Sequence, residues 1–307
     1  MKNKLAIFGI ILIFIAGVGV LSYPLVSSII NNIASRAQAE EYTKTTKLMS
    51  TKENKALWDS AVEYNESLSN NMIITDPFDE EAYKKIGAYY QNSLNVNGEG
   101  LIGYVDIPKI NVYLPVYHGT NDEVLDRYAG HLQNTSLPVG GPNTHAVISA
   151  HTGFPGETFF DYLTDLEEGD EFYIHVLDRT LKYEVDQVKV VLPEVVDTLR
   201  IIDGEDYLTL LTCTPYGMNT HRLHVRGKRV EFDDSTYVTN SASLAAFDGG
   251  NLYFLGYKIP FWMAGVVIGI IILIFVIFVV IIIKNTKKSK GKRFRKETGK
   301  SQIKDGD

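Results

Sequence analysis

Cys213 is the residue in this chain best suited to covalent chemistry, because a cysteine thiolate is a strong nucleophile. It ends a β-like run, Tyr207-Leu-Thr-Leu-Leu-Thr-Cys213, just before a turn that contains proline and glycine. A strand end of this kind presents a side chain to a cleft built by loops. The 307 residues include one cysteine, so an intramolecular disulfide is excluded. The alternative is a buried structural cysteine.

Arg222 and His151 are the two residues best placed to assist such a nucleophile. A thiol ionises near neutral pH only with a base or a positive charge beside it. Arg222 lies nine residues after Cys213, and a short turn between two paired strands would bring it alongside. Its guanidinium would then hold a carbonyl group or stabilise an oxyanion. His151 ends another β-like run before a glycine turn and is the candidate base.

The other six histidines have weaker settings. His221 and His224 lie close to Cys213 in sequence, but Cys-x7-His-x2-His matches no common zinc spacing, so we expect no metal and no organic cofactor. A membrane-bound cysteine protease is a further alternative, although the histidine of papain-like enzymes follows the cysteine and His151 precedes it. The remaining histidines are expected to be structural: His118, His131, His145 and His175.

These side chains need a scaffold of strands. With 45% hydrophobic and 22% charged residues the chain is not wholly disordered. From residue 101, short β-like runs alternate with turn residues, which is typical of a closed barrel or a sandwich. Helical spacing predicts one or two amphipathic helices in 36–70 and a short helix over 79–91. The predicted strands are 102–107, 112–117, 145–149, 171–176, 181–191, 207–211 and 223–230, with short helices over 123–128 and 158–163.

Two uncharged apolar runs, 5–30 and 259–283, lie near the two ends of the chain. As a helix the second run spans roughly 37 Å, enough to cross a bilayer core of about 30 Å. Residues 284–307 carry ten basic and three acidic side chains, a net charge of +7, which the positive-inside rule places in the cytoplasm. The first run follows two lysines and favours an uncleaved anchor, while Ala37-Gln38-Ala39 leaves a cleaved signal peptide open.

The segment between the two basic ends is acidic. The whole chain carries −7 and its ends carry +2 and +7, which leaves −16 for residues 5–283. Such a charge repels a phosphate backbone and argues against nucleic-acid binding. We therefore expect a protein of the cell membrane, with the lipid membrane as a partner. Its catalytic domain is expected outside the cell, and its C-terminal tail and N-terminus in the cytoplasm.

The sequence around Cys213 resembles the sortase family. Thr209-Leu-Leu-Thr-Cys213 matches the sortase signature Thr-Leu-x-Thr-Cys, and Arg222 follows at the family's spacing. His151 lies upstream, in a His-Thr-Gly where many class C sortases have His-Arg-Gly. The stretch from Thr209 to Arg222 looks like class C, the pilin-polymerising transpeptidases of Gram-positive bacteria. Other stretches similar to that class are Ile107-Pro-Lys-Ile-Asn-Val, Leu114-Pro-Val-Tyr-His-Gly119, Gly130-His-Leu and Leu137-Pro-Val-Gly-Gly141.

Two further features favour class C. Asp76-Pro77-Phe78 lies between the first apolar run and the barrel and resembles the lid motif Asp-Pro-Phe/Trp of that class. The second apolar run is the other feature, since class A enzymes usually have only the N-terminal one. We hypothesise that Asp76 pairs with Arg222 and that Phe78 covers Cys213 until substrate arrives.

The resemblance implies a mainly β fold: an eight-stranded sortase β-barrel with N-terminal helices and a lid, flanked by transmembrane helices. It implies that Cys213 attacks the Thr–Gly carbonyl of a Leu-Pro-x-Thr-Gly-type sorting signal. His151 then protonates the leaving amine and Arg222 stabilises the oxyanion, before a lysine of the next pilin resolves the acyl-enzyme. The implied partners are pilins or surface proteins with C-terminal sorting signals. The alternative is a sortase that attaches proteins to the peptidoglycan precursor through the same acyl-enzyme.

A surface protein that is itself a sortase substrate belongs to a different functional class. It would need a Leu-Pro-x-Thr-Gly motif before its last apolar run, and residues 249–260 contain none. The predicted division of the chain is a membrane anchor or signal over 1–35, a helical region with the lid over 36–98, the barrel over 99–230, a linker over 231–258, a transmembrane helix over 259–283 and a basic tail over 284–307.

Overall fold

The structure is a computed structural model of the chain. It describes residues 2–68, 74–79, 87–96, 98–233, 245–248, 251–254, 257–263, 265, 266, 269 and 272. The chain divides into two compact units, Met1–Lys258 and Ile259–Asp307. The first unit holds the strands that the sequence predicts.

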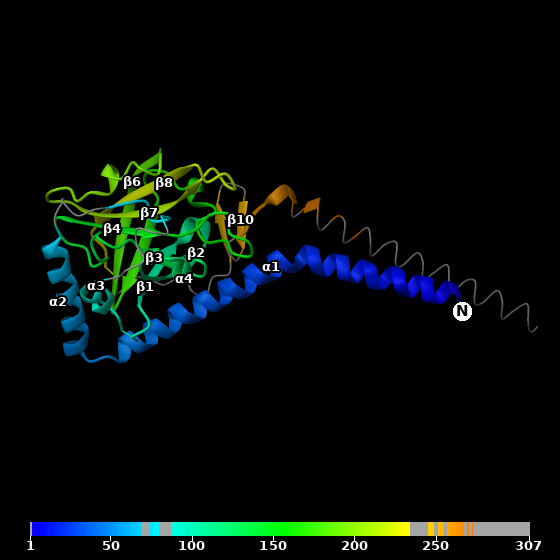
Figure 1. Cartoon of the computed structure of the whole chain (residues 1–307), viewed down its shortest axis with the longest axis horizontal. Coiled ribbons are helices and arrows are strands. Elements are labelled where there is room, and N and C mark those ends of the chain that lie inside the picture. The colour runs from blue at the N-terminus through cyan, green and yellow to red at the C-terminus, as the bar shows by residue number, and fades with distance from the viewer. Residues whose placement is uncertain are drawn as a thin grey trace, which may run out of the picture. The chain divides into compact units, whose positions relative to one another are not determined.

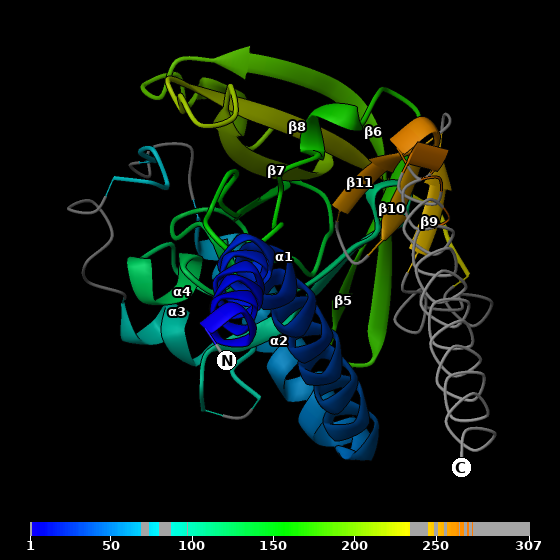
Figure 2. The same ribbon diagram turned by 90° about the vertical axis from the view of Figure 1, so that its right-hand side faces the viewer.

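Eight strands close into a barrel in the order β1-β2-β3-β4-β7-β8-β6-β5, so the predicted eight-stranded β-barrel is confirmed (Figures 1 and 2). β4 pairs with β7 in parallel and β2 with β3 in parallel, while the other neighbours are antiparallel. The strands are β1 Leu101–Ile107, β2 Val112–His118, β3 Ala129–His131, β4 Thr144–Ser149, β5 Glu171–Val176, β6 Arg179–Val191, β7 Asp206–Thr214 and β8 His221–Val230.

Alternation along β7 and β8 decides which side chains fill the barrel. Successive residues of a strand point to opposite faces. Leu208 and Leu210 of β7, with Leu223 and Val225 of β8, therefore belong to the main hydrophobic core. The alternate residues lie on the outer face of the sheet, and they include Cys213 of β7 and Arg222 of β8.

Two helices precede the barrel. α1 (Lys2–Leu48) lies along the β1–β2 side, and α2 (Thr51–Ser67) follows it (Figure 1). A capping box between Ser50 and Glu53 starts α2. Tyr42 anchors α1, because its hydroxyl donates to the Ile102 carbonyl at 2.6 Å and accepts from the Leu177 amide at 2.8 Å. α1 runs without a break through residue 35, where the sequence predicts a domain boundary.

Several elements differ from the sequence prediction. β3 was not expected, and the segment 158–163, predicted as a helix, consists mostly of bends and turns. The predicted short helix over 123–128 is present as α4 (Asp122–Leu125). Residues 231–258, predicted as a linker, contain strands of a small sheet in the order β11-β10-β9. The remaining elements are α3 Ala88–Asn92, β9 Ala245–Asp248, β10 Asn251–Phe254, β11 Tyr257–Pro260, and the 3-10 turns η1 Pro108–Ile110, η2 Leu163–Asp165 and η3 Asp197–Leu199.

The sequence predicts a transmembrane helix over 259–283 and a membrane anchor or signal peptide over 1–35. Within the part of the chain that the structure describes, none of the helices meets the length and hydropathy that a bilayer crossing requires. Most of the second apolar run, 259–283, and all of the basic tail, 284–307, lie outside the described residues.

Candidate active site

Cys213 and Arg222 face each other across the β7–β8 ladder. The two residues are direct partners in the antiparallel register, as the short turn between them predicts. Direct partners on one face of an antiparallel pair bring their side chains close together. Cys213 is 7% exposed and Arg222 is 8% exposed, so both belong to a largely enclosed site.

Asp76 closes this site from outside the barrel. Its carboxylate accepts two hydrogen bonds from Arg222, one from Nε at 2.8 Å and one from Nη2 at 2.5 Å. Bidentate pairs of this kind are among the stronger polar contacts in proteins. Arg222 also donates to the carbonyl oxygens of Asn219 and His221. The structure thus brings Asp76 and Arg222 together, while a lid function remains a prediction.

The Phe78 side chain contacts both Arg222 and His151. Its ring lies 5.1 Å from the guanidinium carbon of Arg222 and 5.3 Å from the centre of the His151 ring. It also packs on an apolar cluster formed by Leu132, Val147, Leu199 and Leu211. Pro77, which lies between Asp76 and Phe78 in the chain, is buried. The segment therefore covers the outer face of β4 and β7 beside the cysteine with an aromatic side chain.

His151 follows the end of β4, as the sequence predicts. The Phe154 ring stacks on its imidazole with ring centres 5.2 Å apart and an interplanar angle of 15°. Sequence reasoning did not identify Phe154, because an aromatic residue three positions after a histidine has no motif of its own. The structure therefore brings His151, Arg222 and Phe78 into one cluster, with Cys213 directly opposite Arg222.

Burial sets the charge state of the site. It raises the pKa of the Cys213 thiol to about 11; the nearby Arg222 charge lowers this pKa and the Asp76 carboxylate raises it. Burial also lowers the pKa of His151, against the raising influence of Asp126 and Asp122. In this conformation both shifts favour the uncharged forms of the two groups. A reactive thiolate therefore requires a change around Cys213.

The remaining histidines hold the barrel together. His131 lies against the Tyr90 hydroxyl at 2.8 Å and the Ser136 carbonyl at 2.7 Å, and burial lowers its pKa to about 3. His224 faces the Thr198 hydroxyl at 2.8 Å. Over the residues that the structure describes, no group of three or more His, Cys, Asp or Glu side chains is arranged to hold a metal ion.

Comparison with known proteins connects this geometry to a family. A sortase domain model matches residues 105–230. The chain is 44% identical to sortase C of Streptococcus pneumoniae, with a TM-score of 0.60 over 64% of this chain and 97% of that structure. The chain belongs to the sortase family. A pilus-related sortase C of Group B Streptococcus is also similar, at 42% identity and a TM-score of 0.57, over 63% of this chain and 97% of that structure.

Curated sortases match over shorter stretches. Sortase D of Bacillus subtilis is 30% identical over 131 residues, which is 42% of this chain and 63% of that protein. The chain thus spans less than two thirds of this curated relative. The solved sortase C structures are covered almost completely, so they are the better guide to the barrel of this sortase and to the segments around it.

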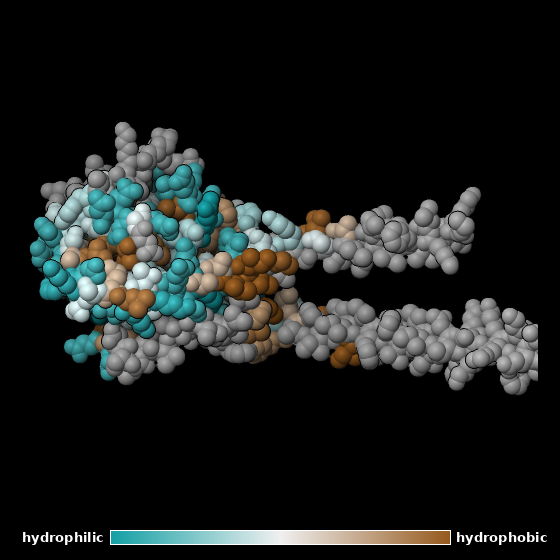
Figure 3. Space-filling view, turned by 90° about the horizontal axis from the view of Figure 1, so that it is seen from below, coloured by the Kyte–Doolittle hydropathy of each residue, from teal (hydrophilic) through white to brown (hydrophobic). Residues whose placement is uncertain are grey.

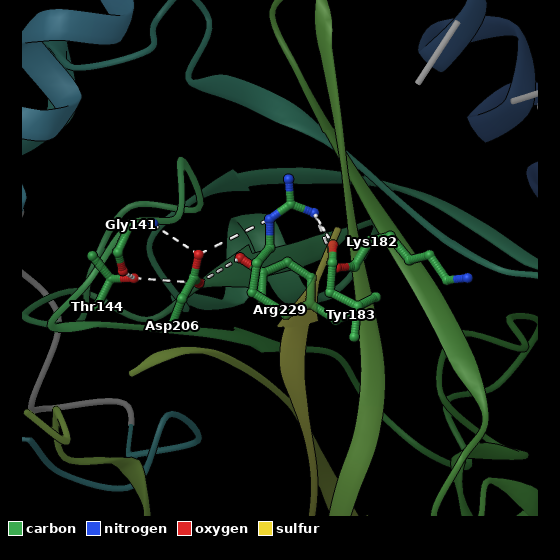
Figure 4. Close-up of polar contacts among 7 residues, drawn as sticks. Gly141, Thr144, Lys182, Tyr183, Asp206 and Arg229 are labelled. Atoms are coloured by element: carbon green, nitrogen blue, oxygen red, sulfur yellow. Dashed lines mark hydrogen bonds and ion pairs between the residues drawn. The ribbon is translucent and has the colours of Figure 1, made fainter. Parts of the chain in front are cut away.

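The sortase barrel also carries a second arginine–aspartate pair, at the other end of β7 and β8. Figure 4 shows Asp206 among polar neighbours from several elements. Its carboxylate accepts from the Gly141 amide at 2.8 Å and from the Tyr183 hydroxyl at 3.0 Å, and Arg229 Nε lies 4.0 Å away. Thr144 adds a weaker contact at 3.4 Å. This cluster joins β4 and the loop before it to β6, β7 and β8.

Proposed function

We propose that this sortase is a cysteine transpeptidase that cleaves Leu-Pro-x-Thr-Gly-type sorting signals and joins pilin subunits. The observation that carries the proposal is the direct pairing of Cys213 with Arg222 on adjacent strands, within the same cluster as His151. The similarity to sortase C structures from pilus-forming streptococci supports the choice of pilins as substrates.

The proposed reaction has two acyl-transfer steps. The Cys213 thiol first passes its proton to His151. The thiolate then attacks the threonine carbonyl carbon, and the Thr–Gly bond breaks as His151 gives that proton to the leaving glycine amine. Arg222 stabilises the negative charge on the carbonyl oxygen in the tetrahedral intermediate. The ε-amine of a pilin lysine then attacks the thioester and gives a proton to His151. The C–S bond breaks, which leaves an isopeptide bond, and the released thiolate takes that proton back as the free thiol.

Product analysis tests this function. The full-length enzyme is incubated with a sorting-signal peptide and a purified pilin, and the products are separated by mass. We expect lysine-linked conjugates from the parent enzyme and neither cleavage nor conjugates from Cys213→Ala. A conjugate formed only with a peptidoglycan-type amine would favour attachment to the cell wall precursor. Hydrolysis without any conjugate would favour a protease.

We propose further that apolar runs 5–30 and 259–283 hold the enzyme at the cell membrane as flanking transmembrane helices, with the barrel outside and both termini in the cytoplasm. α1 supports this placement because it exposes Tyr23, Val26, Ile30 and Ile33. Their spacing of three and four residues puts them on one helix face. Hydrophobic side chains also gather beside the point where α1 leaves the barrel (Figure 3).

Protease treatment of intact cells tests the membrane placement. A tag on residue 307 should survive external protease while the barrel is digested. Loss of the tag from intact cells, or release of the intact enzyme by a high-salt wash, would contradict the placement.

A further inference from the structure

The position of His151 depends on a loop, 150–162, that joins β4 to η2. On one side the residue before His151 is fixed to β7. The Ala150 amide donates to the Leu211 carbonyl at 3.2 Å, and the Thr212 hydroxyl donates to the Ala150 carbonyl at 2.7 Å. On the other side the Phe160 amide donates to the His151 carbonyl at 3.1 Å, which closes the loop on itself.

Asp161 fixes the turn that follows His151. The Gly153 amide donates to Asp161 Oδ1 at 2.7 Å, and the Thr152 side chain also hydrogen-bonds to this carboxylate. The carboxylate therefore binds the two residues directly after the histidine. In the structure it makes these contacts from the far end of the same loop.

Gly153 connects this turn to the loop after Cys213. Its φ of +71° is a left-handed conformation that favours glycine. A Cβ at this position would lie 3.3 Å from the ring of Tyr216, which is the third residue after Cys213. The turn after His151 thus lies between the Asp161 carboxylate and the Tyr216 ring.

α1 holds the outer side of the same loop. The Ser28 and Thr158 hydroxyls lie 3.4 Å apart, and the Asn31 amide donates to the Glu157 carboxylate. The loop is therefore fixed on β7, on α1 and internally, through Asp161 and through the Phe160–His151 hydrogen bond. Among the described residues, Asp161 is the one whose side chain hydrogen-bonds to the two residues after His151.

We propose that Asp161 is a positioning residue that orients His151 for proton transfer beside Cys213. This inference rests on the proposed transpeptidase function. Asp161 acts through the backbone of Gly153 and through Thr152. A small misplacement of a catalytic group costs up to about 100-fold in rate. An amide oxygen accepts the Gly153 N–H as a carboxylate oxygen does, so the hydrogen bond, rather than the charge, carries the effect.

Steady-state kinetics of the full-length enzyme with a fluorogenic sorting-signal peptide test the proposal. We expect Asp161→Ala to lower kcat about tenfold or more, with KM within about twofold of the parent. Asp161→Asn should restore kcat to within about threefold of the parent. Asp165→Ala is the matched control, because Asp165 lies four residues further on and bonds instead to Tyr253 and Lys258. It should keep kcat within about twofold.

Several results would overturn the positioning role. One is a parental kcat in Asp161→Ala, and another is an Asp161→Asn enzyme as slow as Asp161→Ala, since charge would then carry the effect. Thermal unfolding identifies a variant that fails to fold. If Asp161→Ala does not fold, Thr152→Val decides: a kcat about two- to threefold lower at unchanged KM supports the role, and a parental kcat overturns it. Absence of turnover in the parent itself would instead contradict the proposed function.

Discussion

The two ends of β8 each carry an arginine that meets an aspartate, but the two carboxylates are held in different ways. Asp206 belongs to the barrel and is bound by Gly141, Tyr183 and Thr144 in addition to Arg229. Asp76 comes from a segment outside the barrel. Among the described residues, its side chain bonds to Arg222 and, at 3.5 Å, to the amide of Phe78 in its own segment.

The two pairs differ in how many other groups bind the carboxylate. A carboxylate with several further partners holds parts of the barrel together, whereas one with few further partners can be replaced at its arginine. Removing Asp206 leaves the Gly141 amide and the hydroxyl of the buried Tyr183 without their acceptor, so that pair is structural. Removing Asp76 leaves an arginine that retains two carbonyl partners and gains access to solvent or substrate. A substrate carbonyl that displaces Asp76 would meet Arg222 directly opposite Cys213. The contact between Asp76 and Arg222 is therefore suited to replacement by a contact between substrate and Arg222.

The largest expected effect is on turnover, and it distinguishes Arg222 from Arg229. Arg222→Ala should lower kcat about 100- to 1,000-fold, because the developing oxyanion loses its charged donor. Its thermal unfolding should change little. Arg229→Ala should do the reverse, lowering the unfolding temperature while the folded fraction keeps its turnover. Peptide cleavage and thermal unfolding of the two variants check this. Equal loss of stability in both variants, with turnover retained by Arg222→Ala, would remove the distinction.

The second effect separates the two aspartates by stability. Asp206→Ala should reduce the free energy of unfolding by about 2–4 kcal/mol, because the Gly141 amide and the Tyr183 hydroxyl lose their acceptor. Asp76→Ala should reduce it by less, because Arg222 keeps the Asn219 and His221 carbonyl oxygens and gains access to solvent. Denaturant unfolding of the purified proteins measures both values. A loss for Asp76→Ala as large as that for Asp206→Ala would show that the outer segment is part of the fold's framework.

The third effect concerns the reactivity of Cys213. The Asp76 carboxylate raises the pKa of the thiol, so its removal should lower that pKa from about 11. Below its pKa, each unit of decrease raises the thiolate fraction about tenfold. Alkylation of Cys213 should therefore be about tenfold faster in Asp76→Ala at neutral pH, with its pH midpoint moved down. Asp76→Asn is the control that removes charge at constant size. Labelling no faster than in the parent would end the lid hypothesis.

The smallest effect is expected from Phe78. Phe78→Ala removes the ring beside His151 and Arg222 but leaves the Asp76–Arg222 pair in place. Alkylation of Cys213 should rise about threefold from better access, with less movement of the pH midpoint than in Asp76→Ala. Leu132→Ala tests whether a cavity elsewhere in the same apolar cluster has a similar effect. A similar acceleration there would assign the effect to loosened packing.

The pairing of Cys213 with Arg222 could be predicted because it depends on local rules. Two β-like runs joined by a short turn pair in antiparallel register, and alternation then places both residues on one face. The many short strands predicted a closed barrel or a sandwich, and the resemblance carried by Thr209-Leu-Leu-Thr-Cys213 predicted the sortase barrel. The position of Asp76 depends on a contact across 146 residues, and only the resemblance to class C sortases suggested it.

The structure of segment 158–163 could not be predicted correctly, because its apolar residues follow a helical spacing although the segment forms a loop. Phe159, Phe160 and Leu163 are buried in the main core, and their spacing resembles a helix. The Phe160 amide instead bonds back to His151, which makes the segment a closed loop. Asp161 lies in the same segment and has no motif, because its carboxylate binds a backbone amide. The predicted linker contains Tyr253, which is 1% exposed and bonds to Asp165.

The most direct test of the central claim is to trap the acyl-enzyme. Intact-mass analysis of the Asp76→Ala enzyme, mixed with a sorting-signal peptide and no amine acceptor, should show an adduct equal to the acyl part of the peptide. Digestion should place this adduct on Cys213, and Cys213→Ala should show none. Peptide cleavage that persists in Cys213→Ala, or an adduct on another residue, would contradict the account.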